Sequence, residues 1–136
     1  MAQCMRAVEV LLIEDNAGDA TLIRQALCAC LVPVHLHIAR DGEQALLMLT
    51  NPYFRPDLIV LDLNIPKITG TALLGRWQAI PVVVFSSSAN PTEKERCLAL
   101  GAREFVTKPM ELEAFGSAVC GIVERWIMPE EARLAI

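Results

Sequence analysis

The sequence predicts a single α/β domain in which a doubly wound, five-stranded parallel sheet carries helices on both faces. Three observations lead to this fold class. Strand-like segments alternate with helical segments five times along the chain. Two of the strand segments are continuous apolar runs, which is typical of strands buried on both faces. The chain has 136 residues, of which 54% are hydrophobic, and this is enough for one core without disulfide support.

The strands are expected at residues 8–13, 34–38, 57–61, 80–85 and 103–107, of which the last is short. In the second of these, Val34, Leu36 and Ile38 alternate with two histidines, so that one face of the strand is polar. This alternation predicts a strand near an edge of the sheet. We expect the connections between consecutive parallel strands to be right-handed crossovers.

Helical periodicity fills the intervals between the strands. Asn16 is a suitable N-cap for the first helix, whose apolar stripe continues to Cys30. Pro91 is suited to the first turn of the fourth helix, and Gly101 follows the end of that helix. The last four helices are expected over residues 42–50, 71–78, 91–100 and 112–128.

Charge and composition exclude several classes of function. The formal net charge is −4, aromatic residues make up 5% of the chain, and no block of basic residues is present. A surface that binds nucleic acid through phosphate contacts and base stacking is therefore not expected. No apolar run reaches the ~20 residues that cross a bilayer, and residues 1–8 lack the apolar core of a signal peptide. We expect a cytoplasmic protein that does not enter membranes.

Cysteine and histidine spacing gives no clear metal motif. The five cysteines are scattered, and we expect reduced, mostly buried thiols at positions 4, 28, 30, 97 and 120. The spacing of Cys28 and Cys30 fits neither common zinc motifs nor redox motifs. His35 and His37 share the polar face of one strand, but the sequence shows no third ligand. We interpret them as solvated histidines or as histidines that contact a helix.

Polar groups follow four of the five strands at the edge where functional sites form in open parallel sheets. These groups are Glu14, Asp15, Asp62, Ser86 and Lys108. Two carboxylates about 4 Å apart repel each other by about 4 kcal/mol at an effective dielectric constant near 20. The Lys108 ammonium relieves part of this repulsion, and Mg²⁺, which prefers oxygen ligands, would relieve the rest. An ionised carboxylate beside such cations is suited to attack a phosphoryl group.

These residues resemble the receiver domain of two-component response regulators, a family with the CheY-like fold and strand order 2-1-3-4-5. The resemblance extends from about residue 8 to residue 128. It is carried by the strings VLLIEDNAGDATLIRQAL, PDLIVLDLNIPKITG, PVVVFSSS and GAREFVTKP. Each string is weak alone, but together they are specific.

The resemblance assigns a role to each site residue. Asp62 corresponds to the phosphoacceptor, and Mg²⁺ or Mn²⁺ is held by Glu14, Asp15, Asp62 and the backbone carbonyl of Asn64. Ser86 corresponds to the switch hydroxyl, Lys108 to the lysine that contacts the phosphoryl group, and Phe105 to the switch aromatic residue. The Lys108–Pro109 peptide bond is a candidate for the cis form that is usual in the family.

The resemblance also implies a domain organisation and a set of partners for the protein. Only eight residues follow Met128, so we expect one stand-alone receiver domain over residues 1–136, with a core at about 8–128 and a short tail. The strings EDNAGDATLIRQAL and FGSAVCGIVERWIM are most similar to single-domain regulators that partner phytochrome-type histidine kinases. A sensor histidine kinase, a downstream protein and a homodimer through the fourth helix, fifth strand and fifth helix are the expected partners. The spacing of 24 positions from Asp62 to Ser86 is short for the family and indicates a clipped third helix.

The same fold class also supports other functions. A phosphorelay intermediate, a chemotaxis-type receiver, and a degenerate receiver that acts only by binding proteins remain alternatives. A haloacid-dehalogenase-type phosphatase would need a second aspartate two residues after Asp62, where Asn64 stands. A flavodoxin-like cofactor binder would need a phosphate loop after the first strand, where Glu14 and Asp15 would repel a phosphate. We therefore expect a signalling domain and not a turnover enzyme.

Overall fold

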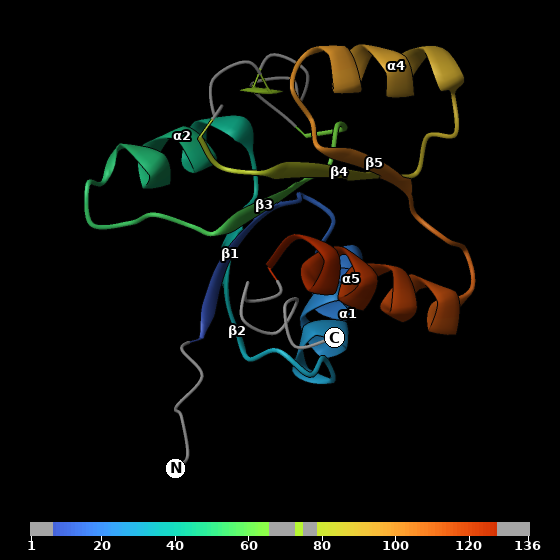
Figure 1. Ribbon diagram of the computed structural model, residues 1–136, viewed down its shortest axis with the longest axis horizontal. Coiled ribbons are helices and arrows are strands. Elements are labelled where there is room, and N and C mark those ends of the chain that lie inside the picture. The colour runs from blue at the N-terminus through green and yellow to red at the C-terminus, as the bar shows by residue number, and fades with distance from the viewer. Residues whose placement is uncertain (1–6, 66–72, 75–78, 128–136) are drawn as a thin grey trace.

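The computed structural model describes residues 7–65, 73–74 and 79–127 of the chain. Five strands form one parallel sheet in the order β2-β1-β3-β4-β5, which confirms the predicted fold (Figure 1). The predicted strand ends agree with the structure to within two residues. The strands are β1 (Val8–Ile13), β2 (Val34–Ala39), β3 (Leu58–Leu61), β4 (Val82–Ser86) and β5 (Glu104–Thr107).

Among the described residues, three helices connect consecutive strands and a fourth follows β5, and capping residues of the sequence mark several of their ends. Asn16 and Asn90 are N-caps whose side chains accept hydrogen bonds from backbone N–H groups of the first turn. Gly101 has a φ of 114°, a conformation that glycine adopts without strain, and it lets the chain turn from a helix into β5. The helices are α1 (Ala17–Cys28), α2 (Gly42–Thr50), α4 (Pro91–Ala99) and α5 (Leu112–Ile127). Of the helix expected at 71–78, all but residues 73 and 74 lie outside the described residues.

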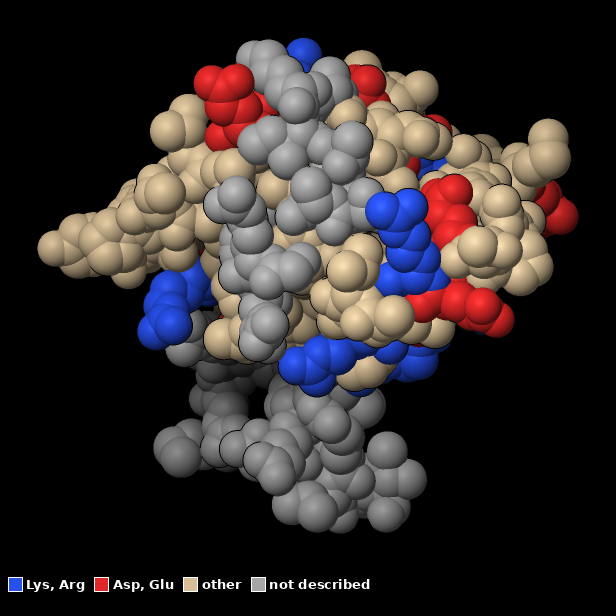
Figure 2. Space-filling view, turned by 90° about the horizontal axis from the view of Figure 1, so that it is seen from above, with Lys and Arg blue, Asp and Glu red and all other residues tan. Residues whose placement is uncertain are grey.

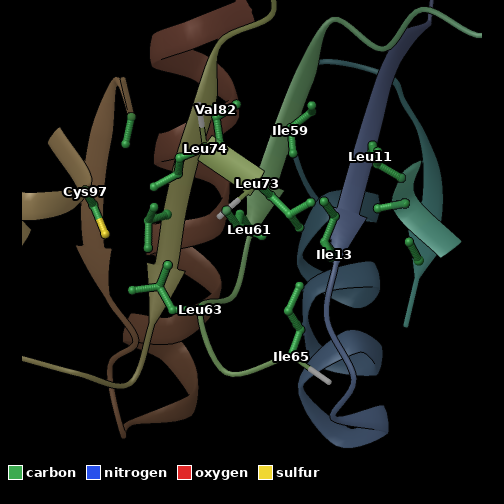
Figure 3. Close-up of a cluster of buried hydrophobic side chains, with 14 of the residues drawn as sticks. Leu11, Ile13, Ile59, Leu61, Leu63, Ile65, Leu73, Leu74, Val82 and Cys97 are labelled. Carbon is green, nitrogen blue, oxygen red and sulfur yellow. The ribbon is translucent and has the colours of Figure 1, made fainter. Parts of the chain in front are cut away.

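The helices cover the two faces of the sheet in separate layers, with α1 and α5 on one face and α2 and α4 on the other (Figure 1). Alternate residues of β1 supply the two layers. Val10 and Leu12 pack in the cluster that includes Ile23 of α1 and Ile122 of α5. Leu11 packs on the opposite face with side chains that include Ala45 and Cys97, in the cluster drawn in Figure 3. Burial on both faces fixes the register of the central strands, since a slip of one residue would exchange the two faces.

The edges of the sheet carry the more polar strands. β2 lies at one edge, as the histidine alternation predicted, and β5 lies at the other. On the face that carries α2 and α4, basic and acidic side chains are interspersed in a mostly uncharged surface (Figure 2). The described part of this face thus offers no broad basic area for a phosphate backbone. Among residues 7–65, 73–74 and 79–127, no helix is long and apolar enough to cross a bilayer.

The expectation that all cysteines are reduced is wrong for one pair. Cys30, just after α1, and Cys120 in α5 form a disulfide across 90 residues of sequence, with Cα atoms 5.6 Å apart. The two helices pack side by side against the same face of the sheet, which brings the cysteines within bonding distance. Two other described cysteines are free thiols, with Cys97 buried and Cys28 exposed.

We expect the Cys120→Ser variant to lose about 2–4 kcal/mol of unfolding free energy under oxidising conditions, because the unfolded chain gains the freedom of a long open loop. Urea unfolding with and without a thiol reductant measures this difference. In reductant the variant and the wild type should unfold at similar urea concentrations. An equal gap between the two proteins in both conditions would contradict a role for the disulfide.

Candidate functional site

Three carboxylates gather where β1 and β3 end. Glu14 and Asp62 directly follow these strands and are 2% and 6% exposed, whereas Asp15 is exposed. The strands are paired with Ile13 beside Leu61, and the Asp62 N–H donates a 3.0 Å hydrogen bond to the Ile13 carbonyl. Each of the three acids has an oxygen within 4.8 Å of the others. The structure therefore brings together the acids that the sequence predicted at this edge.

Lys108 brings the opposing charge from the end of β5. Its backbone N–H donates a 2.7 Å hydrogen bond to the Ser86 carbonyl, which fixes the start of the side chain beside the end of β4. The Lys108 Nζ lies 2.7 Å from Glu14 Oε1 and 3.4 Å from Asp62 Oδ2. With its side chain only 8% exposed, Lys108 forms a largely buried ion pair with Glu14.

The pKa values reflect this crowding of charge. Burial raises the pKa of Glu14 to about 7, the hydrogen bond to Asp62 adds to the rise, and Lys108 opposes it. For Lys108, burial lowers the pKa, but hydrogen bonds to Asp19 and Glu14 outweigh this and raise it to about 12. The ammonium is thus fully charged at neutral pH, while the acids exceed it in number. A divalent cation would be favoured by this imbalance.

Asp19 belongs to the site but was missed by sequence reasoning. Its Oδ2 lies 2.8 Å from Lys108 Nζ, and its N–H donates to the side chain of the N-cap residue Asn16. The sequence does contain an indication of this position. Asn16, the N-cap of α1, follows the end of β1 closely, so the first turn of α1, which contains Asp19, lies near the end of that strand. The contact itself depends on the tilt of α1, which the spacing of residues does not reveal.

Of the remaining predicted site residues, Asn64 and Ser86 lie at the carboxyl ends of β3 and β4, whereas Phe105 lies within β5. The Asn64 N–H donates a 3.1 Å hydrogen bond to Asp62 Oδ1, which holds the loop after β3 against this carboxylate. Ser86 is fully buried, and its Oγ accepts a 3.3 Å hydrogen bond from the Ser88 N–H. Phe105 is 8% exposed and packs in the core cluster beneath α2 and α4.

The expectation of a cis bond before Pro109 is wrong. None of the peptide bonds in the described residues is cis, and the Lys108–Pro109 bond is among them. Trans is the intrinsic preference before proline by about 0.5–1 kcal/mol, so a cis bond requires specific support from its surroundings.

Comparison with known proteins agrees with this geometry. The response regulator receiver domain family matches residues 10–119 of the chain. Response regulator Rcp1 of Synechocystis sp. is 32% identical over 131 residues, which cover 87% of this chain and 88% of Rcp1. The chain belongs to the response regulator receiver domain family, whose members act in phosphorylation-dependent signalling.

Two solved structures are similar over nearly the whole fold. The phosphorylated cyanobacterial phytochrome response regulator RcpA gives a TM-score of 0.84 at 34% identity, with coverage of 90% of this chain and 96% of RcpA. The Mn²⁺-bound form of Rcp1 gives a TM-score of 0.81 at 31% identity, with coverage of 89% of this chain and 95% of the Rcp1 chain. The similar proteins therefore include one response regulator, RcpA, whose name refers to a phytochrome.

We expect Glu14→Gln to stabilise the metal-free protein, because the buried carboxyl has a higher pKa when folded than when unfolded. The unfolded state then loses its proton first, so the wild type loses stability as pH rises from about 4.5 to about 7. Above pH 7 the wild type has lost about 3 kcal/mol of unfolding free energy relative to its value below pH 4.5, and the variant does not have this loss. Urea unfolding in a chelator at about pH 8 and about pH 5 should show a larger gain at the higher pH. A gain that is equal at both values would contradict the raised pKa.

Proposed function

We propose that Asp62 accepts a phosphoryl group from the phosphohistidine of a sensor histidine kinase. The observation that carries this proposal is a nearly buried Asp62 carboxylate whose Oδ2 lies 3.4 Å from a charged lysine, with Glu14 beside it. An Asp62 oxygen attacks phosphorus as the P–N bond breaks, and the imidazole nitrogen takes the electron pair of that bond. The product is an aspartyl phosphate.

The donor set fits a hard divalent cation such as Mg²⁺ or Mn²⁺, because the acids that converge here offer only oxygen ligands. We propose that Glu14, Asp15, Asp62 and the backbone carbonyl of Asn64 hold this ion. When bound, the ion neutralises charge on the phosphoryl oxygens and on the acids around them. The Mn²⁺-bound structure of the similar Rcp1 supports this assignment.

Lys108 provides the second positive charge. Its ammonium already lies among Glu14, Asp19 and Asp62, so its position is set before a phosphoryl group arrives. A phosphoryl group on Asp62 would present new anionic oxygens within reach of Nζ. The fixed ammonium stabilises the transferring group without needing to move far or to shed bulk water.

Ser86 and Phe105 form the proposed readout. Ser86 ends β4 and pairs in register with Thr107, two residues beyond Phe105 on β5. We propose that the Ser86 hydroxyl turns to donate a hydrogen bond to the phosphoryl group, and that Phe105 then repacks. Only contacts that differ between the two states can shift such an equilibrium. The surface that changes is formed by α4 and β5.

The partners that we propose follow from the similar proteins. RcpA is described as a cyanobacterial phytochrome response regulator, which supports a phytochrome-type kinase as donor. The family match supports a regulator, and we propose that its output is a change in protein binding. A homodimer through α4, β5 and α5 is proposed as well, because Leu98 and Leu100 at the end of α4 are each 40% exposed.

We expect incubation with a small-molecule phosphodonor and Mg²⁺ to add one phosphoryl group per chain, measured by intact mass. Asp62→Asn should remove the gain. Asp57→Asn is the matched control, since Asp57 is exposed and precedes β3, whereas Asp62 follows the opposite end of that strand. No gain in the folded wild type, or an unchanged gain in Asp62→Asn, would contradict Asp62 as the acceptor.

A Ser86→Ala variant should still gain the phosphoryl group but should lose its structural response. In the wild type, phosphorylation is expected to change amide hydrogen exchange along β5 and α4, because Ser86 links the phosphoryl group to these elements. Ser87→Ala, at the exposed neighbouring position, is the control and should respond as the wild type does. The coupling through Ser86 fails if Ser86→Ala shows the same exchange changes as the wild type.

A further inference from the structure

A second cluster of ligand-type side chains lies at the opposite end of β1 from the acidic site. Glu9 and His35 are partners in the β1–β2 register, and His37 follows on the same face of β2. Glu9 Oε2 lies 3.0 Å from His35 Nδ1, and Glu9 Oε1 lies 2.9 Å from His37 Nε2. The sequence showed the two histidines, but the third group is evident only from the pairing of the strands.

We propose that Glu9, His35 and His37 bind one transition-metal ion of the Zn²⁺ class. Their ligand atoms lie within 4.8 Å of one another, so modest side-chain rotations bring all three onto one ion. Two histidines spaced by one residue on a strand and a carboxylate from the adjacent strand supply three of the four ligands of a tetrahedral zinc site. The fourth position is open to water.

The chemistry of the donors separates this site from the acidic one. Imidazole nitrogens favour Zn²⁺, Cu²⁺ and Ni²⁺, whereas Mg²⁺ prefers an all-oxygen set. Glu9 and Glu14 are five residues apart along β1 and its extension, which corresponds to roughly 16 Å at the rise of a strand. The chain would therefore hold two metal sites of different preference at opposite ends of one strand.

The cluster is both anchored and accessible. The Glu9 N–H donates a 2.9 Å hydrogen bond to Asp57 Oδ2, and the Asp57 N–H donates a 2.7 Å hydrogen bond to the Glu9 carbonyl. The His37 ring packs edge-on against Phe54 with centroids 4.8 Å apart. The side chains of Glu9, His37 and His35 are 27%, 30% and 72% exposed, so an ion can reach them from solvent.

The test is a Zn²⁺ titration of the full chain, purified without a histidine tag, against a chromophoric chelator in excess Mg²⁺. One Zn²⁺ per chain is expected, and Glu9→Gln, His35→Gln and His37→Gln should each weaken binding by roughly tenfold or more. Glu95→Gln, an exposed carboxylate on α4, should not. Two further controls remove other candidate ligands, Asp15→Asn in the acidic site and Cys28→Ser, whose exposed thiol lines the same hollow as His35.

A second readout uses the wild type alone, so that misfolding of a variant cannot decide the outcome. The chain contains only two histidines, and nitrogen-15 NMR should show Zn²⁺ shifting the His35 Nδ1 and His37 Nε2 signals together. Unmoved histidine signals at saturating Zn²⁺ would overturn the proposal. So would Zn²⁺ affinity that survives His37→Gln, or affinity that is lost in Asp15→Asn or Cys28→Ser.

Discussion

The contact of one buried ammonium with carboxylates from separate elements is the interaction on which the site depends. Lys108 approaches from the end of β5 and lies within 3.4 Å of acids that follow β1 and β3 and of one in α1. Without that charge, Glu14 and Asp62 would repel each other in a poorly solvated edge of the sheet. Lys108 does not fully offset the environment of Glu14, because burial first, and then the hydrogen bond and charge of Asp62, still raise the pKa of Glu14 to about 7. The excess of acids over the single ammonium favours a divalent cation at this edge, and the cation and Lys108 would together offset the charge of the phosphoryl group that we propose for Asp62.

The apolar layers hold this arrangement in place. β1 and β3 end with fully buried side chains at Ile13 and Leu61, so neither strand can shift without exposing core surface. The disulfide between Cys30 and Cys120 adds a covalent link between α1 and α5 on one face. β5 is one of the two edge strands and has fewer buried residues than β4 beside it. It is therefore suited to be the element whose packing responds to phosphorylation.

Features set by local sequence were predicted well, and features set by long-range geometry were not. The bounds of β1 and α2 matched the structure because apolar runs and cap residues mark them. The acids and Lys108 were expected to meet because parallel strands end at the same edge. The Cys30–Cys120 disulfide and the contact of Asp19 with Lys108 depend on how α1 packs, and Glu9 joins the histidines only through strand register. The bond before Pro109 is trans, contrary to the expectation from the family.

In the proposed mechanism, Asp62 itself carries the phosphoryl group. Borohydride reduces an aspartyl phosphate to homoserine, so peptide mass spectrometry after phosphorylation and reduction identifies the modified position directly. We expect homoserine at position 62 in the phosphorylated wild type, and aspartate there when the phosphodonor is omitted. Homoserine at position 15 or 19 in place of position 62, the corresponding five-carbon amino alcohol (2-amino-5-hydroxypentanoic acid) at Glu14, or a phosphorylated chain with no reducible residue, would contradict the assignment.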